Sequence, residues 1–178
     1  REIVEKLERF IALAPLHQPH NLNGIKAIAG LLPDVRQVAC FDTAFHRTNP
    51  PVAQAFAIPR ALSAEGIKRY GFHGLSYEFI ARALPGHTPR ASGRVIVAHL
   101  GNGSSMCGMV DRKSMVSTMG FTAIDGLMMG TRTGAIDPGV LIYLMDNKGM
   151  GSPELTRLLS KESGLLGVSG ISQDIHAY

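Results

Sequence analysis

A glycine-rich turn after an apolar segment is the first feature of this sequence that could bind a ligand. The turn lies in His99–Ser105 (HLGNGSS), and Arg94–Leu100 is predicted to be a strand that leads into it. Glycine lets a backbone approach a ligand closely, and successive amide N–H groups in a turn can form an anion-binding nest. A plain hairpin turn also favours Asn-Gly, but it requires neither the histidine before it nor the serines after it. We interpret the segment as a phosphate-binding loop, with the hairpin turn as the alternative.

Two further loops carry side chains that suit an anion. Arg132 lies between glycines in Gly126–Gly139 (GLMMGTRTGAIDPG), with Asp137 nearby, and its forked donors match phosphate or carboxylate oxygens. His73 precedes a glycine and a predicted helix, and backbone N–H groups at a helix start attract anions. A surface arginine and a structural histidine are the alternatives.

Asp42 follows the apolar run Val35–Phe41, which is predicted to be a buried strand. The carboxyl end of a strand in a parallel sheet is a usual place for chemistry, although a turn or capping aspartate is the alternative. His17 and His20 have a spacing that can serve a metal, but no third ligand is nearby, so no metal site is expected. Together the charged groups suit phosphoryl transfer, and they also suit a carboxylate-binding site without catalysis.

The elements that must position these groups alternate between helix and strand, which predicts an α/β or α+β fold. Residues 16–21, 120–134 and 164–172 are predicted to be loops, and the proline-punctuated residues 49–60 a crossover between domains. Ser152 is predicted to cap a helix. Helices are predicted over 2–14, 22–32, 76–84, 139–147 and 152–161, strands over 35–41 and 94–100, and a β-hairpin over 106–118.

The composition excludes several classes of protein. The net charge of +4 comes from basic residues spread singly along the chain, which does not fit a nucleic-acid-binding arm. No apolar stretch is long enough for a membrane span. Cys40 and Cys107 each lie in an apolar run and are predicted to be buried, reduced thiols, so a cytoplasmic location is expected.

Several motifs in one order resemble the acetate kinase family, which includes acetate, propionate and butyrate kinases. The resemblance implies an actin-like (ribonuclease H-like) fold with two domains and a cleft between them. Residues 1–44 would be the last part of the first domain and 45–178 the first part of the second. The motifs are LAPLH (Leu13–His17), FDTAFH (Phe41–His46), RYGFHG (Arg69–Gly74), HLGNGSS, MGFTAIDGLMMGTRTGAIDPG (Met119–Gly139) and SGLLGVSGIS (Ser163–Ser172).

The resemblance also implies site roles for an ATP- and Mg²⁺-dependent acetate kinase that makes acyl phosphate and ADP. Asp42 matches a catalytic acid/base or carboxylate-orienting group, and His73 and Arg132 match groups that stabilise the transferring phosphoryl. The metal ligands of the family lie outside this chain. The remaining matches are a histidine in the cleft (His17), the nucleotide phosphate loop (His99, Leu100, Gly101, Asn102 and Gly103) and a segment at the nucleoside (Asp174, Ile175 and His176).

The sequence departs from the family pattern at a few positions: HQPHN follows the first motif, Leu75 and Tyr77 replace a threonine and a histidine, and His176 replaces an arginine. Family members are also much longer than 178 residues, so both ends are expected to be cut and the isolated chain to be inactive. A non-catalytic remnant of an enzyme is the alternative, and another actin-like ATPase is a third hypothesis. Acetate is the expected acid, with propionate next, and a homodimer is expected from the family.

Overall fold

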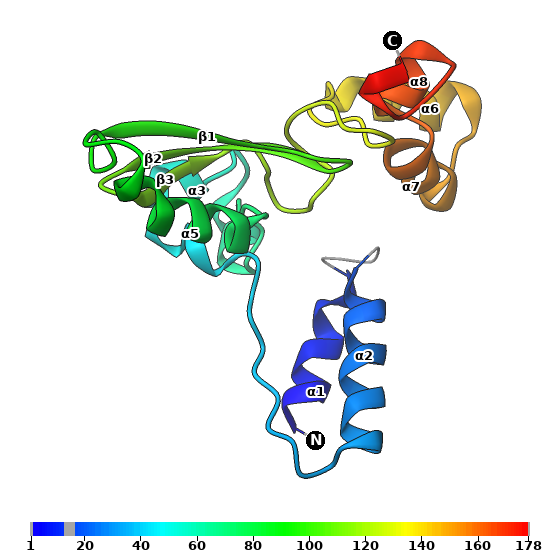
Figure 1. The fold of residues 1–178 in the computed structure, drawn as a ribbon. Coiled ribbons are helices and arrows are strands. Elements are labelled where there is room, and N and C mark those ends of the chain that lie inside the picture. The colour runs from blue at the N-terminus through cyan, green and yellow to red at the C-terminus, as the bar shows by residue number, and fades with distance from the viewer. Residues whose placement is uncertain (1, 13–16, 178) are drawn as a thin grey trace. The chain divides into compact units, whose positions relative to one another are not determined.

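The computed structural model describes residues 2–12 and 17–177, which belong to two compact units, Arg1–Cys40 and Phe41–Tyr178. Figure 1 shows their elements. The boundary between the units lies near the predicted domain boundary after residue 44. That predicted boundary refers to the domains of the whole family fold, and it stays a prediction.

The first unit is a helical hairpin. Helix α1 (Glu2–Glu8) continues into the 3₁₀ turn η1 (Arg9–Ala12), and α2 spans Gln18–Leu31. Leu7 and Leu22 are buried between the helices, and Gln18 Nε2 donates to the carbonyl of Leu7 at 2.9 Å. The loop predicted over residues 16–21 is wrong from residue 18 onward, because Pro19 stands in the first turn of α2, where a helix tolerates proline.

The segment between α2 and the second unit is extended but is not the buried strand that its apolar residues predict. Val38 and Phe41 are exposed at 79% and 52%, and no described residue forms a β ladder with this segment. A strand needs a neighbouring strand for its backbone hydrogen bonds. Cys40 is consequently an exposed free thiol, which corrects the prediction that both cysteines are buried; Cys107 is free and buried as predicted.

The second unit is built on a three-stranded antiparallel sheet with the order β1-β2-β3. Its strands are β1 (Arg94–Leu100), β2 (Ser104–Val110) and β3 (Lys113–Ser117), which confirms the predicted strand and hairpin. Asp111 and Arg112 both have positive φ (49° and 60°), as a two-residue type I′ hairpin turn requires. Asp42 follows residues 35–41, which form no strand, so the expectation of Asp42 at the end of a strand in a parallel sheet is wrong.

Helix α5 (Gly74–Ala83) covers one face of this sheet (Figure 1). Tyr77 and Ala81 of α5 pack against Cys107 and Met109 of β2 to form the core. The strand register sets Val97 opposite Cys107 and His99 opposite Ser105. Facing residues of an antiparallel pair share a face, and side chains repeat on that face every second residue. His99 and Ser105 therefore lie on the core face, at the end of the sheet where α5 begins.

The other elements of this unit are short helices joined by loops. Residues 164–172, predicted to be a turn-rich connection, contain α8, because Gly164 at φ 65° turns the chain directly into a helix. Ser152 is the first helical residue and not the cap, which is Gly151. The helices are η2 (Ala44–Thr48), α3 (Pro51–Gln54), α4 (Arg60–Ala64), η3 (Leu84–Gly86), α6 (Pro138–Lys148), α7 (Ser152–Lys161), α8 (Gly164–Ser169) and η4 (Ile175–Ala177).

Within the described ranges 2–12 and 17–177, no helix is long and apolar enough to cross a membrane.

Candidate functional site

His73 is held at the start of α5 by its backbone. It has a left-handed conformation, with φ 57° and ψ 23°, which is uncommon for a residue other than glycine. Its amide N–H donates to Asp42 Oδ2 at 2.7 Å, and the next amide, of Gly74, donates to the Asp42 carbonyl at 2.8 Å. Asp42 therefore fixes the turn that presents the His73 side chain, and the two predicted site residues lie in direct contact.

The imidazole of His73 is held by two further contacts. Its Nδ1 lies 2.8 Å from Ser105 Oγ. Its ring stacks on the ring of His99, with centroids 4.0 Å apart and planes 20° apart. His99 Nδ1 in turn lies 3.1 Å from Ser76 Oγ in the first turn of α5. His99 comes from strand β1 and His73 from the residue before α5. Their stacked rings and the two serine contacts hold both imidazoles in place.

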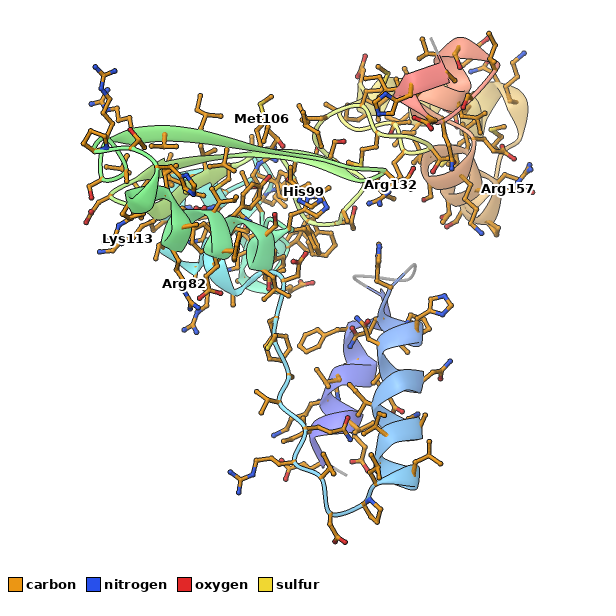
Figure 2. The ribbon with its side chains drawn as sticks, in the orientation of Figure 1. Arg82, His99, Met106, Lys113, Arg132 and Arg157 are labelled. Atoms are coloured by element: carbon orange, nitrogen blue, oxygen red, sulfur yellow. The ribbon has the colours of Figure 1, made fainter. Side chains whose placement is uncertain are left out.

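Arg132 brings a cationic group to the same region from the glycine-rich loop after β3. The side chain is buried, with 9% of its surface exposed, and burial lowers the pKa of its guanidinium. Arginine stays charged in proteins, so its buried charge needs partners. Nη1 donates to the carbonyl of Ala123 at 2.8 Å. Figure 2 shows Arg132 and His99 on their two elements.

Backbone hydrogen bonds brace the loop that carries Arg132. The amide of Met129 donates to the Arg132 carbonyl at 3.1 Å, closing a turn, and the amide of Ser163 donates to the Thr131 carbonyl at 3.0 Å. The amide of Gly130 donates to the carbonyl of Asn102, at the tip of the β1–β2 turn, at 3.1 Å. The loop is irregular, as predicted, but its position relative to the β1–β2 turn is fixed.

His73 and Arg132 converge on Gly103. A Cβ placed on Gly103 would lie 2.9 Å from Nη2 of Arg132 and 3.2 Å from Nε2 of His73. An imidazole and a guanidinium that face one small space form a site for an anionic oxygen. Because both side chains lie this close, position 103 has no room for a side chain of its own.

The glycine turn Gly101–Gly103 joins β1 to β2, so the segment is a hairpin turn as well as one wall of the anion site. The amide of Gly101 donates to the carbonyl of Gly103 at 3.1 Å, and Ser104 Oγ donates to the carbonyl of Gly101 at 2.9 Å. The Gly101 amide is therefore occupied within the turn and contributes no donor to an anion in this conformation.

The remaining predicted site residues lie at the border of this region or elsewhere. Asp174, Ile175 and His176 are exposed, and Asp174 Oδ1 accepts from the amide of His176 at 2.9 Å, which forms the η4 turn. Gln173 is the residue before this segment, and its carbonyl oxygen would lie 3.3 Å from a Cβ built on Gly130. The same Cβ would also meet the side chain of Asn102. Leu100 is exposed at 72%.

Two residues singled out in the sequence lie outside this cluster. Asp137 caps α6, because its Oδ1 accepts from the amide of Gly139 at 2.9 Å, so its contact is structural. His17 belongs to the first unit, at the residue before α2, and it is exposed. Its assignment to a cleft stays a prediction.

Several residues that shape the site were not selected from the sequence for this role. Ser105 is fully buried between His73 and the hydroxyl of Tyr77. Arg69 Nη1 lies 2.9 Å from Asp125 Oδ2, which ties the segment before His73 to the loop that contacts Arg132. Ser105 could have been found from the alternation along β2, which sends it to the same face as Cys107.

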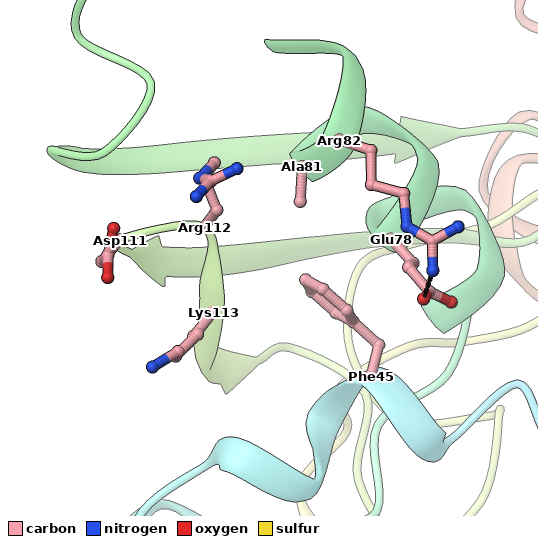
Figure 3. A pocket seen from close by; sticks show the side chains of 7 residues that line it. All are labelled: Phe45, Glu78, Ala81, Arg82, Asp111, Arg112 and Lys113. Atoms are coloured by element: carbon pink, nitrogen blue, oxygen red, sulfur yellow. Dashed lines mark hydrogen bonds and ion pairs between the residues drawn. The ribbon is translucent and has the colours of Figure 1, made fainter. Parts of the chain in front are cut away.

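A separate pocket of about 270 Å³ lies on the other side of the second unit. Phe45 and Ala81 form its floor, and Arg82, Arg112 and Lys113 lie around it (Figure 3). Arg82 is already paired with Glu78. No predicted site residue lines this pocket. Among the residues that the structure describes, no group of three or more histidine, cysteine, aspartate or glutamate side chains is arranged to hold a metal ion.

Comparison with known proteins shows to which class of fold this chain belongs. The chain superimposes on a propionate kinase of Francisella tularensis with a TM-score of 0.91 and 44% identity, over 98% of this chain and 45% of that one. It superimposes on the acetate kinase of Porphyromonas gingivalis with a TM-score of 0.85 and 43% identity, over 98% of this chain and 45% of that one. The mixed α/β chain is therefore part of the actin-like fold of short-chain carboxylate kinases, as expected.

The same relationship holds in sequence. An acetate kinase of Rhodopseudomonas palustris is 58% identical over 176 residues, which are 98% of this chain and 44% of that protein. The model of the acetokinase family matches residues 1–178. The chain belongs to the acetokinase family, and it spans less than half the length of the relatives it matches.

Proposed function

We propose that the intact protein containing this chain transfers a phosphoryl group reversibly between ATP and a short carboxylate, acetate or propionate. The observation that carries the proposal is the close approach of Arg132 Nη2 and His73 Nε2 to Gly103. Membership of the acetokinase family supports the choice of acceptor. The products in the forward direction are acyl phosphate and ADP.

In this reaction a carboxylate oxygen forms a bond to the γ-phosphorus while the bond from that phosphorus to the leaving oxygen of ADP breaks. The transferring group spreads its charge over its equatorial oxygens, so a protein contributes mainly by positioning and charge stabilisation. Arg132 supplies a desolvated cation and His73 an imidazole beside the same space, and both are held rigid before any ligand arrives. Preorganised donors in a water-poor site are worth more than the same donors in water.

Asp42 supports His73 in this proposal. One of its oxygens already accepts from the His73 amide at 2.7 Å, which assigns that oxygen to positioning. We propose that the other oxygen orients the carboxylate or acts as an acid/base. The nucleotide phosphates would lie against the His99–Gly103 turn, with Asp174–His176 toward the nucleoside. His17 would line the cleft in the intact protein.

ATP fits the residues present because the glycine turn and Arg132 offer a close backbone approach and a charge. Mg²⁺ would neutralise the phosphates, and the family resemblance implies that its ligands lie outside this chain. We also infer a cytoplasmic homodimer from the family resemblance. The 178-residue chain alone is expected to be inactive, because it covers about 44% of its relatives.

The test is acyl phosphate formation from ATP and acetate or propionate by the intact protein, trapped with hydroxylamine. Arg132→Ala is compared with Arg157→Ala, an exposed arginine whose Nη1 pairs with Glu162 (Figure 2). We expect a loss on the order of 100-fold or more in kcat for the first variant and no loss for the second. Equal activity of the wild type and Arg132→Ala would overturn the assignment. Absence of product from the intact wild type would favour a non-catalytic remnant.

A further inference from the structure

Ser105 forms a link between Tyr77 and the catalytic candidate His73. Its Oγ lies 2.8 Å from His73 Nδ1 and is also hydrogen-bonded to the hydroxyl of Tyr77. Both Ser105 and Tyr77 have 0% of their surface exposed. Solvent therefore does not compete for these hydroxyl groups, and their protons must be shared among the groups present.

The direction of the first hydrogen bond follows from the protonation of the tyrosine. Burial is the largest influence on Tyr77 and raises the pKa of its phenol, so the phenol keeps its proton at neutral pH. The hydrogen-bond partner of this buried hydroxyl is Ser105 Oγ, so the phenol proton is donated to that oxygen.

The second hydrogen bond follows from the serine having a single proton. A hydroxyl that accepts from Tyr77 has its own proton available for its other neighbour, Nδ1 of His73. We propose that Tyr77 and Ser105 are positioning residues that hold His73 as its Nε2–H tautomer, so that the ring presents a hydrogen-bond donor to the space at Gly103. Nδ1 is then the acceptor of the ring, and Nε2 carries the proton.

The tautomer matters because of what the ring presents to an anion. Nε2 lies 3.2 Å from the position that a Cβ on Gly103 would take, next to Nη2 of Arg132. An Nε2–H group attracts an anionic oxygen there, whereas the opposite tautomer would present a lone pair and repel it. The stacking on His99 holds the plane of the ring but does not distinguish the two nitrogens. This consequence for catalysis rests on the proposed function, whereas the tautomer itself does not.

The tautomer can be measured directly by ¹⁵N NMR of histidine-labelled protein at about pH 8, above the ordinary titration of imidazole. Protonated and unprotonated ring nitrogens have widely separated ¹⁵N shifts. We expect His73 in the wild type to be protonated at Nε2. Tyr77→Phe removes one oxygen, frees Ser105 to accept as well as donate, and should produce a mixture of tautomers at His73.

Tyr70→Phe is the matched control, because it also removes a phenol that donates to a partly buried acceptor, the Gly66 carbonyl at 2.8 Å, but does not touch Ser105. The His73 signals should be unchanged in this control. A wild-type spectrum with the proton on Nδ1, or a Tyr77→Phe spectrum identical to that of the wild type, would overturn the proposal.

Kinetics of the intact protein supply a second readout. Ser105→Ala leaves Nδ1 without its donor, and kcat should fall on the order of 10-fold, as when a supporting hydrogen bond behind a functional histidine is lost. KM for ATP should stay within about twofold of the wild-type value, because the ring itself remains in place. A change confined to KM would contradict a positioning role. If the wild type transfers no phosphoryl group, the proposed function fails, and the NMR measurement still decides the tautomer.

Discussion

Replacing Gly103 by alanine tests whether Arg132 and His73 share one anion site. The new Cβ would lie 2.9 Å from Arg132 Nη2 and 3.2 Å from His73 Nε2. A methyl group would therefore displace these two side-chain ends from the positions that we assign to the anion site. The carbonyl of Gly103 also accepts the Gly101 amide that closes the β1–β2 turn, and alanine keeps this carbonyl, so the substitution is a local probe.

The structure predicts a large effect on activity and a small one on stability. Gly103 does not have a left-handed φ, so alanine adds no backbone strain, and the nearest atoms are the ends of two side chains. Overpacking usually costs about 1–3 kcal/mol, and the low end applies because the crowded atoms are side-chain ends and not backbone atoms. Such a cost lowers Tm by roughly 2–4 °C in a domain of this size. Losing one anion-stabilising donor costs about 10²–10³ in kcat.

The assay is hydroxylamine-trapped acyl phosphate formation by the intact protein, with a thermal melt of the same sample. Gly86→Ala is the control, because a Cβ there meets no atom within 4 Å. We expect Gly103→Ala to lose at least about 100-fold in kcat with a nearly unchanged melt. Wild-type activity in Gly103→Ala would refute the shared site, and a collapse of Tm together with activity would refute the claim that position 103 acts locally.

Three other perturbations have defined outcomes. Gly74→Ala places a Cβ 2.0 Å from the Asp42 carbonyl oxygen, a backbone atom, so urea denaturation should show a loss of about 1–3 kcal/mol; an unchanged midpoint would contradict this contact. Asp125→Asn removes a partly exposed ion pair with Arg69, and its cost should stay below about 1 kcal/mol and shrink in high salt. Burial lowers the pKa of His46 below its unfolded value of about 6.5, so the folded state takes up fewer protons than the unfolded state. The contribution of His46 to the free energy of unfolding is therefore fully present above that pH and is lost as the pH falls. His46→Gln should flatten the pH dependence of stability in denaturation curves. Equal pH slopes in the wild type and the variant would contradict this role of His46.

Sequence patterns predict the elements that are complete within this chain. The run Arg94–Leu100 and the hairpin after it are found as strands, because each has its pairing partner in the adjacent sequence. The helix predicted over residues 76–84 is found as α5 (Gly74–Ala83), although it begins two residues earlier, directly after His73. Local signals suffice where both partners of a contact are close along the chain.

The wrong predictions have a different physical origin. Val35–Phe41 has the composition of a buried strand, but composition cannot supply the neighbouring strand that its backbone requires. The helix Gly164–Ser169 was missed because its glycines and serines favour turns. There, contacts with the Arg132 loop override propensity: the amide of Leu165 donates to the carbonyl of Met129 at 2.8 Å.

For the candidate site too, the sequence predicts which residues take part but not how they are arranged. Residue type and flanking glycines single out His73, Arg132 and Asp42, and the resemblance to a kinase family gives them roles. Their geometry depends on contacts between distant segments, such as Asp42 with His73 and Gly103 with Arg132. No local pattern encodes such pairings. The tyrosine–serine link to His73 is of the same kind, because Tyr77 and Ser105 meet only when α5 lies on β2.

The conformation of His73 connects the fold to the chemistry. A left-handed residue other than glycine costs about 1–2 kcal/mol, so φ 57° at His73 requires compensation. Asp42 supplies it with its side chain at His73 and its carbonyl at Gly74. The same turn starts α5, which places Tyr77 one helical turn later against Ser105. The strained backbone thus directs the imidazole to Gly103, and the helix that follows brings the hydroxyl groups that hold its far nitrogen.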